Sequence, residues 1–287
     1  MFPRLQDAKV SIVGLGLMGG SLAAALMARR ACRRVIGIAR RQETVGRALD
    51  MGLIHEGTCH LSQGVQNADV VVLAVPVRTI LELIDRIGHL LPPGCLLTDV
   101  GSTKGTVVQA MRSLPFHVQP VGGHPMCGKE TSGLSAADAS LYEGATYVLT
   151  PLRRTGDGAL ALACELAQAI GARPLLMDAP HHDELVAAVS HLPYLLAVGL
   201  VASAEGLTND DVWEVAATGF RDTTRLAASD ETMMLDILFT NQAAVRQMLA
   251  RYQDQLANLS RSLERGSEAG LRTAITAAAK RRRRLFQ

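Results

Sequence analysis

The sequence predicts an α/β domain with a doubly wound parallel sheet over residues 1–178, followed by an all-α domain over residues 179–287. Short apolar runs rich in β-branched residues alternate with helical stretches in the first part. Strands that are apolar continuously belong in a parallel sheet covered on both faces. After Asp178-Ala179-Pro180 only helical periodicity remains. A chain of 287 residues also exceeds the usual size of one hydrophobic core.

The predicted elements of the first domain alternate regularly along the chain. We expect strands at residues 10–13, 35–38, 70–75, 95–99, 117–121, 147–149 and 173–177. We expect helices between them at residues 19–29, 43–51, 77–91, 104–112 and 158–170. This β-α-β rhythm is typical of a Rossmann-type fold.

Composition narrows the class of protein. A net charge of +2 is too small for a nucleic-acid-binding surface, so no nucleic-acid partner is expected. The five cysteines form no CxxC pair, which favours a reduced compartment, and no metal site is expected. The first residues hold no apolar signal-peptide core. These observations predict a cytoplasmic protein.

One apolar stretch tests the soluble interpretation. Residues 185–204 contain no Asp, Glu, Lys or Arg and approach the roughly 20 residues that span a bilayer. His191 and Pro193 interrupt the stretch, acidic residues flank it, and no second such segment accompanies it. We therefore expect no membrane insertion, but a helix buried inside the helical domain or a dimer.

A glycine-rich segment, Gly14-x-Gly16-x-x-Gly19, follows the first predicted strand and opens the first helix. Gly14 allows the tight turn, Gly16 lets backbone N–H groups approach a pyrophosphate, and Gly19 lets the helix pack closely on the sheet. This context predicts a dinucleotide site. The residues expected to contact the cofactor there are Gly14, Gly16, Leu17, Met18, Gly19, Val75 and Pro76.

The second strand ends where a protein that binds NAD normally carries an acidic residue for the adenine ribose. Arg40 and Arg41 follow Ala39 here instead. Arginine can bind a 2′-phosphate with charge-assisted hydrogen bonds, so the sequence predicts preference for NADP, with NAD possible. The alternative is that both arginines are solvated surface residues.

Two segments near predicted strand ends carry candidate catalytic groups. Ser102 either orients a neighbour or caps the helix that contains Lys104. His124 lies in a glycine-flanked loop after a strand, and a neutral imidazole suits removal of a hydroxyl proton during hydride transfer. A structural role for this histidine is the alternative.

The helical half adds Arg221 and Arg225, four residues apart, with Asp222 between them. They form either a surface salt-bridge network or a clamp for a substrate carboxylate. His191, inside the apolar stretch, is either a satisfied core histidine or a substrate ligand.

Five motifs in order resemble the prephenate and arogenate dehydrogenases of tyrosine biosynthesis. They are VGLGLMGGSLA at 13–23, TDVGSTK at 98–104, GGHPMCGKETSG at 122–133, SHLPYLLA at 190–197 and GFRDTTRLA at 219–227. The resemblance implies a dinucleotide-binding domain followed by a helical dimerisation domain that forms a homodimer. It also implies oxidative decarboxylation of prephenate or arogenate with NAD(P).

By this resemblance His124 is the catalytic histidine and Ser102 its hydrogen-bonding serine. Arg225 matches the arginine that grips the side-chain carboxylate, and His191 a histidine that contacts substrate. Glu130 and Arg221 match a charged pair that gates the pocket.

Two alternatives compete with this interpretation. One is another dehydrogenase of the same superfamily, such as a β-hydroxyacid dehydrogenase or a pyrroline-carboxylate reductase. The other is a non-catalytic NADP-binding sensor, which needs no histidine at position 124. Within the family, the absence of an unambiguous acidic partner for the arogenate ammonium favours prephenate as substrate.

Overall fold

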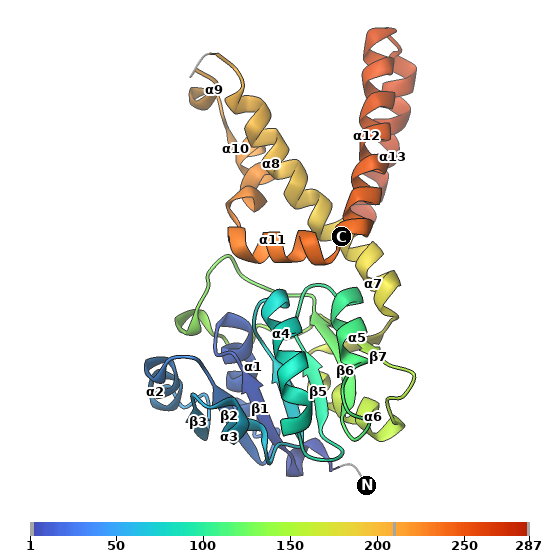
Figure 1. The fold of residues 1–287 in the computed structure, drawn as a ribbon. Helices are drawn as coiled ribbons and strands as arrows, with labels where there is room; N and C mark the ends of the chain where they lie inside the picture. The colour runs from blue at the N-terminus through green and yellow to red at the C-terminus, as the bar shows by residue number, and fades with distance from the viewer. Residues whose placement is uncertain (1–2, 209–210, 286–287) are drawn as a thin grey trace. The chain divides into compact units, whose positions relative to one another are not determined.

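One twisted sheet organises the first part of the computed structural model, which describes residues 3–208 and 211–285 (Figure 1). Its order is β3-β2-β1-β4-β5-β6-β7-β8. The strands are β1 (Lys9–Val13), β2 (Arg34–Ile38), β3 (Glu56–Thr58), β4 (Val70–Leu73), β5 (Leu96–Asp99), β6 (Gln119–Pro125), β7 (Thr146–Pro151) and β8 (Arg173–Leu176). The strand order reverses between β1 and β4, and doubly wound sheets bind ligands in the crevice at this point.

The doubly wound fold is confirmed, with three local corrections. β7 runs antiparallel to β6, so the sheet is not parallel throughout. The polar strand β3 was not predicted, because a sequence of only Glu-Gly-Thr carries no strand pattern. His124 lies within β6, paired with Val148, and not in a loop. Gly122 and Gly123 hid this extension because glycine is depleted in strands.

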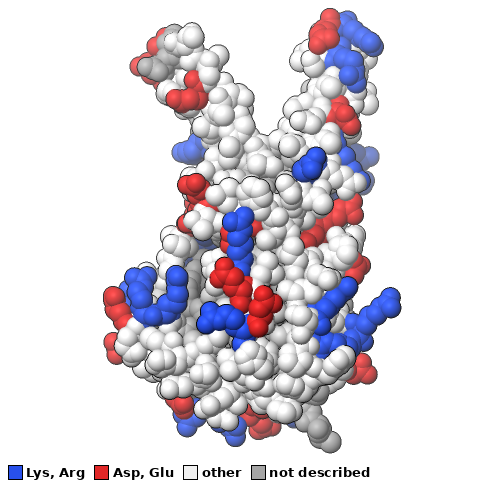
Figure 2. All heavy atoms as spheres, viewed as in Figure 1, with Lys and Arg blue, Asp and Glu red and all other residues white. Residues whose placement is uncertain are grey.

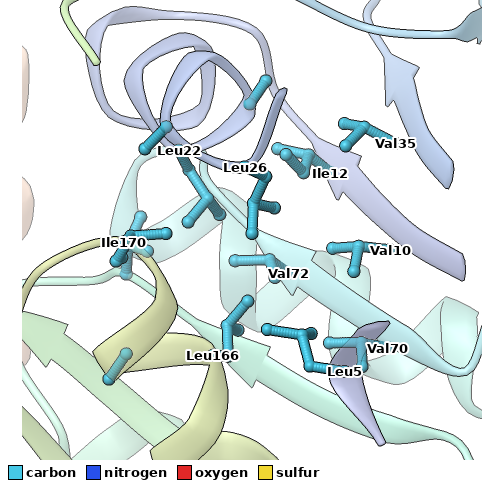
Figure 3. Packing of buried hydrophobic residues seen from close by; sticks show 14 of the residues in the cluster. Leu5, Val10, Ile12, Leu22, Leu26, Val35, Val70, Val72, Leu166 and Ile170 are labelled. Atoms are coloured by element: carbon cyan, nitrogen blue, oxygen red, sulfur yellow. The ribbon is translucent and has the colours of Figure 1, made fainter. Parts of the chain in front are cut away.

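Helices cover both faces of the sheet and bury two apolar layers. They are α1 (Leu17–Ala28), α2 (Gln42–Asp50), α3 (Leu61–Val65), α4 (Val77–Ile87), α5 (Gly105–Met111) and α6 (Asp157–Ala169). On one face, Leu22 and Leu26 of α1 and Leu166 of α6 pack toward Ile12 and Val72 of the sheet (Figure 3). Each fully buried leucine contributes about 1.5–3 kcal/mol. The core therefore fixes where the carboxyl ends of the strands lie.

The chain after β8 is helical, as predicted. The elements are α7 (Ala179–Val186), a π-helical turn η4 (Ala187–His191), α8 (Leu192–Glu205), α9 (Asp211–Glu214), α10 (Thr218–Thr224), a 3-10 turn η5 (Arg225–Ala228), α11 (Glu231–Thr240), α12 (Gln242–Glu264) and α13 (Glu268–Leu285). α12 and α13 pack as a hairpin around Gly266, whose φ of 60° permits the turn.

Contacts divide the chain into the compact units Met1–Asn241 and Gln242–Gln287. Helices up to α11 therefore stay with the sheet. Asp236 of α11 accepts a hydrogen bond from the backbone N–H of Arg78 at 3.3 Å and pairs with the guanidinium of Arg78. The boundary expected at residue 178 marks the change from strands to helices, and its role as a domain boundary stays a prediction.

The apolar stretch forms part of a continuous helical segment, Ala179–Glu205, that is long and apolar enough by composition to cross a membrane. Only 28% of its most apolar window is buried. Burial inside the chain is thus a wrong expectation for most of this segment. Within this segment Val189 and Leu185 lie at 68% and 41% exposure. Cover by a second copy of the chain stays a prediction.

Candidate active site

The glycine segment forms a cradle between β1 and α1. Gly14 has φ of 101°, and a Cβ atom there would overlap the carbonyl oxygen of Ala74. A Cβ at Gly19 would overlap the carbonyl oxygen of Gly14, whereas Gly16 faces open space. The first turn of α1 begins at Gly16 without a side-chain cap, so its N–H groups are available. This arrangement fits a pyrophosphate.

The other expected cofactor residues surround this cradle. Leu17 and Met18 are half-buried in the first turn of α1, and Val75 packs against the position where Gly14 lacks a Cβ. Pro76 is the exposed N-cap of α4. These residues come from the ends of neighbouring strands β1 and β4. They therefore lie on the side of the sheet where a dinucleotide binds.

Arg40 and Arg41 are exposed at the carboxyl end of β2. Within residues 3–208 and 211–285, neither guanidinium forms an ion pair with an acidic side chain. Both side chains thus remain available to an anion at the far end of the cradle.

Asp99, the last residue of β5, fixes the loops around the site. Its carboxylate accepts hydrogen bonds from the N–H groups of Gly101 at 2.9 Å and Gly123 at 3.0 Å, and it pairs with the buried ammonium of Lys104. A Cβ at Gly123 would overlap the carbonyl oxygen of Asp99. β6 therefore lies close against the end of β5, and this packing positions His124 beside the carboxyl end of β5.

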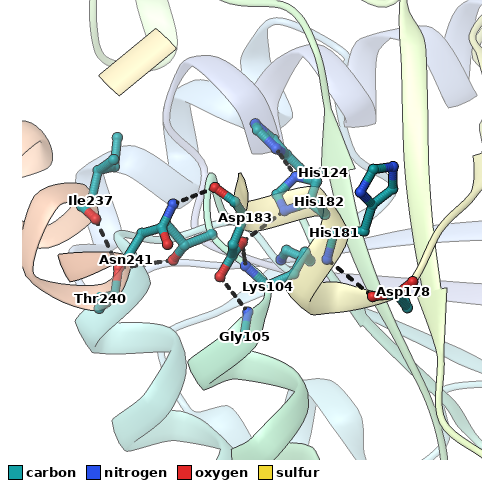
Figure 4. A network of polar contacts seen from close by, with 12 residues as sticks. Lys104, Gly105, His124, Asp178, His181, His182, Asp183, Ile237, Thr240 and Asn241 are labelled. Carbon is teal, nitrogen blue, oxygen red and sulfur yellow. Dashed lines mark hydrogen bonds and ion pairs between the residues drawn. The ribbon is translucent and has the colours of Figure 1, made fainter. Parts of the chain in front are cut away.

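His124 begins a chain of buried polar groups (Figure 4). Its Nδ1 lies 2.7 Å from Nε2 of His182, and Nδ1 of His182 lies 2.8 Å from Oδ1 of Asp183. The Asp183 carboxylate also accepts from the N–H groups of Lys104 and Gly105, both at 2.8 Å. Asp183 of α7 thereby caps the start of α5 and anchors the histidine pair.

This chain determines which nitrogen of His124 is free. The carboxylate of Asp183 accepts hydrogen bonds, so His182 donates from Nδ1. His182 then accepts at Nε2 from the Nδ1–H of His124, and the lone pair of His124 stands on its own Nε2. The sealed side-chain polar atoms without a partner, among described residues, are Thr98 Oγ1 and Thr150 Oγ1. His124 Nε2 is thus open to the site.

The electrostatic surroundings keep His124 neutral. Burial, followed by the electrostatic effects of His182, Lys104 and His191, holds the pKa of His124 well below its usual value of 6.5. Burial also lowers the pKa of Lys104, while Asp99 opposes this shift. An unprotonated imidazole with a free Nε2 can accept a proton from a bound hydroxyl.

Ser102 lies half-buried after β5 and is not the helix cap. α5 begins after Lys104 without a cap from its own chain segment, and Asp183 supplies that cap instead. The capping alternative for Ser102 is therefore wrong. In the described part of the chain, its hydroxyl has no recorded hydrogen bond, which leaves it available to substrate or to a neighbouring group.

His191 ends the π-helical turn η4, two residues before Pro193 in the first turn of α8. It is buried, and its Nδ1 lies 3.2 Å from the amide nitrogen of Asn241. Burial lowers the pKa of His191 to about 4, although Asp183 opposes this shift, and His182 adds a smaller lowering effect. His191 is therefore a neutral polar group beside the histidine pair.

Glu130 forms its ion pair with a different arginine from the one that the resemblance implies. Glu130, in the β6–β7 connection, pairs with Arg225 at the start of η5. Arg221, one turn earlier, pairs with its neighbour Asp222 at 3.5 Å. Glu130 thus faces Arg225 and not Arg221 in the described chain, and the gating role of Glu130 and Arg221 stays a prediction. All of these side chains are exposed.

His182, Asp183 and Asn241 were missed by sequence reasoning. His182 and Asp183 lie 58 and 79 residues from the partners they bond in the sheet domain, and pattern alone does not reveal such pairs. The available signal was the run His181-His182-Asp183 directly after the helix start at Asp178. Among the described residues, no His, Cys, Asp and Glu cluster could hold a metal.

A doubly wound sheet with a glycine cradle, and an imidazole base at the carboxyl ends of its strands, together define a nicotinamide-dependent dehydrogenase. The chain matches the family model of the prephenate dehydrogenase nucleotide-binding domain over residues 22–176 and that of the dimerization domain over residues 178–277. The chain therefore belongs to the prephenate dehydrogenase family. This membership excludes the β-hydroxyacid dehydrogenase and pyrroline-carboxylate reductase interpretation.

Comparison with individual relatives supports the same family assignment. The chain is 38% identical over 237 residues to the prephenate dehydrogenase of Bacillus subtilis, covering 81% of this chain and 64% of that protein. The A. aeolicus prephenate dehydrogenase in complex with hydroxyphenyl propionate and NAD+ is 31% identical, with a TM-score of 0.91 over 97% of this chain and 98% of that chain. The Synechocystis arogenate dehydrogenase is 29% identical, with a TM-score of 0.83 over 96% and 99%.

Proposed function

We propose that this protein oxidatively decarboxylates prephenate to 4-hydroxyphenylpyruvate in tyrosine biosynthesis, with NADP as the preferred hydride acceptor and NAD as a second one. Membership in the prephenate dehydrogenase family supports the reaction class. The observation that carries the proposal is His124, whose Nε2 is free while Nδ1 is held at 2.7 Å by His182.

In the proposed reaction, His124 Nε2 takes the proton from the ring hydroxyl as hydride leaves the same carbon. The glycine cradle would hold the pyrophosphate of the dinucleotide, and its nicotinamide would supply the acceptor for that hydride. The ring carboxylate then leaves as CO₂, its bonding electrons complete the aromatic ring, and the resulting phenolate oxygen takes the proton back from His124. His182 and Asp183 hold the imidazole in the tautomer that this step needs. Burial of His124 keeps the base unprotonated.

The remaining site residues bind and orient the substrate in this proposal. Ser102 holds the hydroxyl or the imidazole in line, and His191 donates to a substrate oxygen. Arg225 binds the side-chain carboxylate, for which Glu130 must first release its guanidinium. Arg221 lies one turn away and contributes positive charge at the entrance.

Cofactor preference follows from the end of β2. Arg40 and Arg41 are exposed, without acidic partners among described residues, where an acidic residue would select against a 2′-phosphate. The residues that we propose to hold the dinucleotide are Gly14, Gly16, Leu17, Met18, Gly19, Arg40, Arg41, Val75 and Pro76.

Arogenate is the second candidate substrate, and one observation favours it. Glu130 already faces the guanidinium of Arg225, so a substrate with adjacent carboxylate and ammonium groups would find an acidic and a basic partner together. Prephenate carries a keto group in place of the ammonium and needs only the arginine.

We also propose a cytoplasmic homodimer whose helical domain, residues 179–287, supplies the contact. The family model that matches residues 178–277 describes a dimerization domain. The middle of α8 carries few charged side chains on the face drawn in Figure 2. Val198 and Leu200 of this helix are exposed. Apolar exposure of this extent on one helix favours cover by a partner subunit.

The experiment measures kcat/KM for prephenate and arogenate with NADP and with NAD, using the wild-type protein and His124→Asn. We expect prephenate with NADP to give the largest value. His124→Asn should lower kcat by about 10²–10⁴-fold with a modest change in KM, because a general base acts mainly in the transition state. Near-normal turnover of this variant would reject His124 as the base. A variant with full biological activity would support a non-catalytic NADP sensor.

A further inference from the structure

Asn241 lies between His191 and Asp183, the residue that anchors the His124–His182 pair. It is the buried C-cap of α11, 5% exposed, and it directly follows Thr240, whose hydroxyl lies 2.8 Å from that of Thr103. Its amide nitrogen lies 2.8 Å from the backbone carbonyl oxygen of Asp183 and 3.2 Å from Nδ1 of His191 (Figure 4). Asn241 therefore contacts the same residue that anchors the His124–His182 pair.

The orientation of the Asn241 amide is fixed by its partners. The backbone carbonyl of Asp183 can only accept a hydrogen bond, so the NH₂ group, and not the oxygen, must face it. The second hydrogen of the same NH₂ group points at His191 Nδ1, which must then accept. A neutral imidazole that accepts at Nδ1 carries its proton on Nε2.

His191 Nε2 is free to use that proton. In the described part of the chain no protein group bonds this atom, and it is not among the sealed polar atoms without a partner. A buried imidazole whose N–H remains accessible donates a hydrogen bond to a ligand oxygen. It cannot serve as the base, because its only lone pair is occupied by Asn241.

We propose that Asn241 is a positioning residue that holds His191 with its proton on Nε2, so that His191 donates to substrate while His124, protonated on Nδ1, accepts from it. Asp183 fixes the tautomers of both His124 and His191, through different atoms. Its carboxylate orients His182 and thereby His124, whereas its backbone carbonyl orients Asn241 and thereby His191. The assignment of His191 to substrate binding rests on the proposed function, but the tautomer does not.

The test records long-range ¹H–¹⁵N correlations of the full-length protein labelled with ¹⁵N-histidine, assigned with His124→Asn and His191→Asn. We expect the proton on Nε2 of His191 and on Nδ1 of His124. In Asn241→Asp the carboxylate accepts, so the His191 proton should move to Nδ1 while His124 keeps its state. Asn258→Asp, the same change on exposed α12, should alter neither histidine.

Kinetics of the same variants test the consequence. Asn241→Asp should raise KM for the substrate by about 10–100-fold with a smaller change in kcat, as for loss of one hydrogen bond to a charged group. A wild-type His191 protonated on Nδ1 would overturn the proposal, and this spectrum suffices even if the variant does not fold. A moved proton with unchanged KM would also overturn the positioning role. Correct tautomers in a protein that turns over neither substrate would refute the proposed function alone.

Discussion

Replacing His182 by leucine tests whether the base depends on its buried partner. The 2.7 Å hydrogen bond from His124 Nδ1 to His182 Nε2 would be lost, which leaves a buried N–H without an acceptor. An unsatisfied buried donor costs about 1–3 kcal/mol. That energy disfavours the Nδ1–H tautomer of His124, so kcat should fall by about 5–150-fold, since about 1.4 kcal/mol corresponds to tenfold.

The assay measures kcat and KM at neutral pH. KM should stay within about twofold, because His182 itself does not touch substrate in the proposed mechanism. His182→Gln retains an acceptor and should recover most of kcat. His181→Leu is the matched control, because His181 is exposed and only its backbone N–H is used, by Asp178. Wild-type kcat in the leucine variant, or a raised KM with intact kcat, would refute the reasoning.

Four further changes probe other parts of the site. Arg40→Ala should weaken NADP binding by roughly 1.5–3 kcal/mol and leave NAD binding nearly unchanged; equal losses in titrations of both cofactors would reject a phosphate contact. Arg225→Ala should chiefly raise KM, and an unchanged KM would assign the carboxylate to another cation. Because the pKa of His124 is lowered, the imidazole stays neutral as pH falls through 6.5. A kcat/KM profile should therefore remain flat there, and loss of activity already above pH 6.5 would contradict this. Gly14→Ala, at φ of 101°, should lower the free energy of unfolding by about 1–3 kcal/mol and abolish dinucleotide binding. In Gly46→Ala, where the added Cβ contacts nothing, calorimetry should find no loss in the free energy of unfolding.

Local patterns carried most of the fold. Continuous apolar runs identified the strands of the sheet, and the change to helical periodicity after Asp178 agrees with the start of α7. The direction of β7 was not predictable, because strand residues look alike in either direction. β3 escaped because three polar or small residues have no period, and its pairing with β2 is what defines it as a strand.

The site was predictable only where residues are close in sequence. The glycine cradle and His124 stand out because glycines mark close backbone approach. His182 and Asn241 act through contacts across 58 and 50 residues of chain, and packing of α7 against α5 and of α11 against α4 brings them together. Likewise, the sequence did not show that Glu130 pairs with Arg225, the first residue of η5, in the structure.

The π-helical turn Ala187–His191 gives the helical segment one more residue per turn than an α-helix can hold. An α-helix advances by about 100° per residue. Loss of one residue before His191 in this turn would restore a regular helix and rotate His191, together with α8, by about that angle relative to α7. The number of residues in this turn thus determines the direction in which His191 points. A family member that lacks the extra residue would need a different group to contact the substrate there.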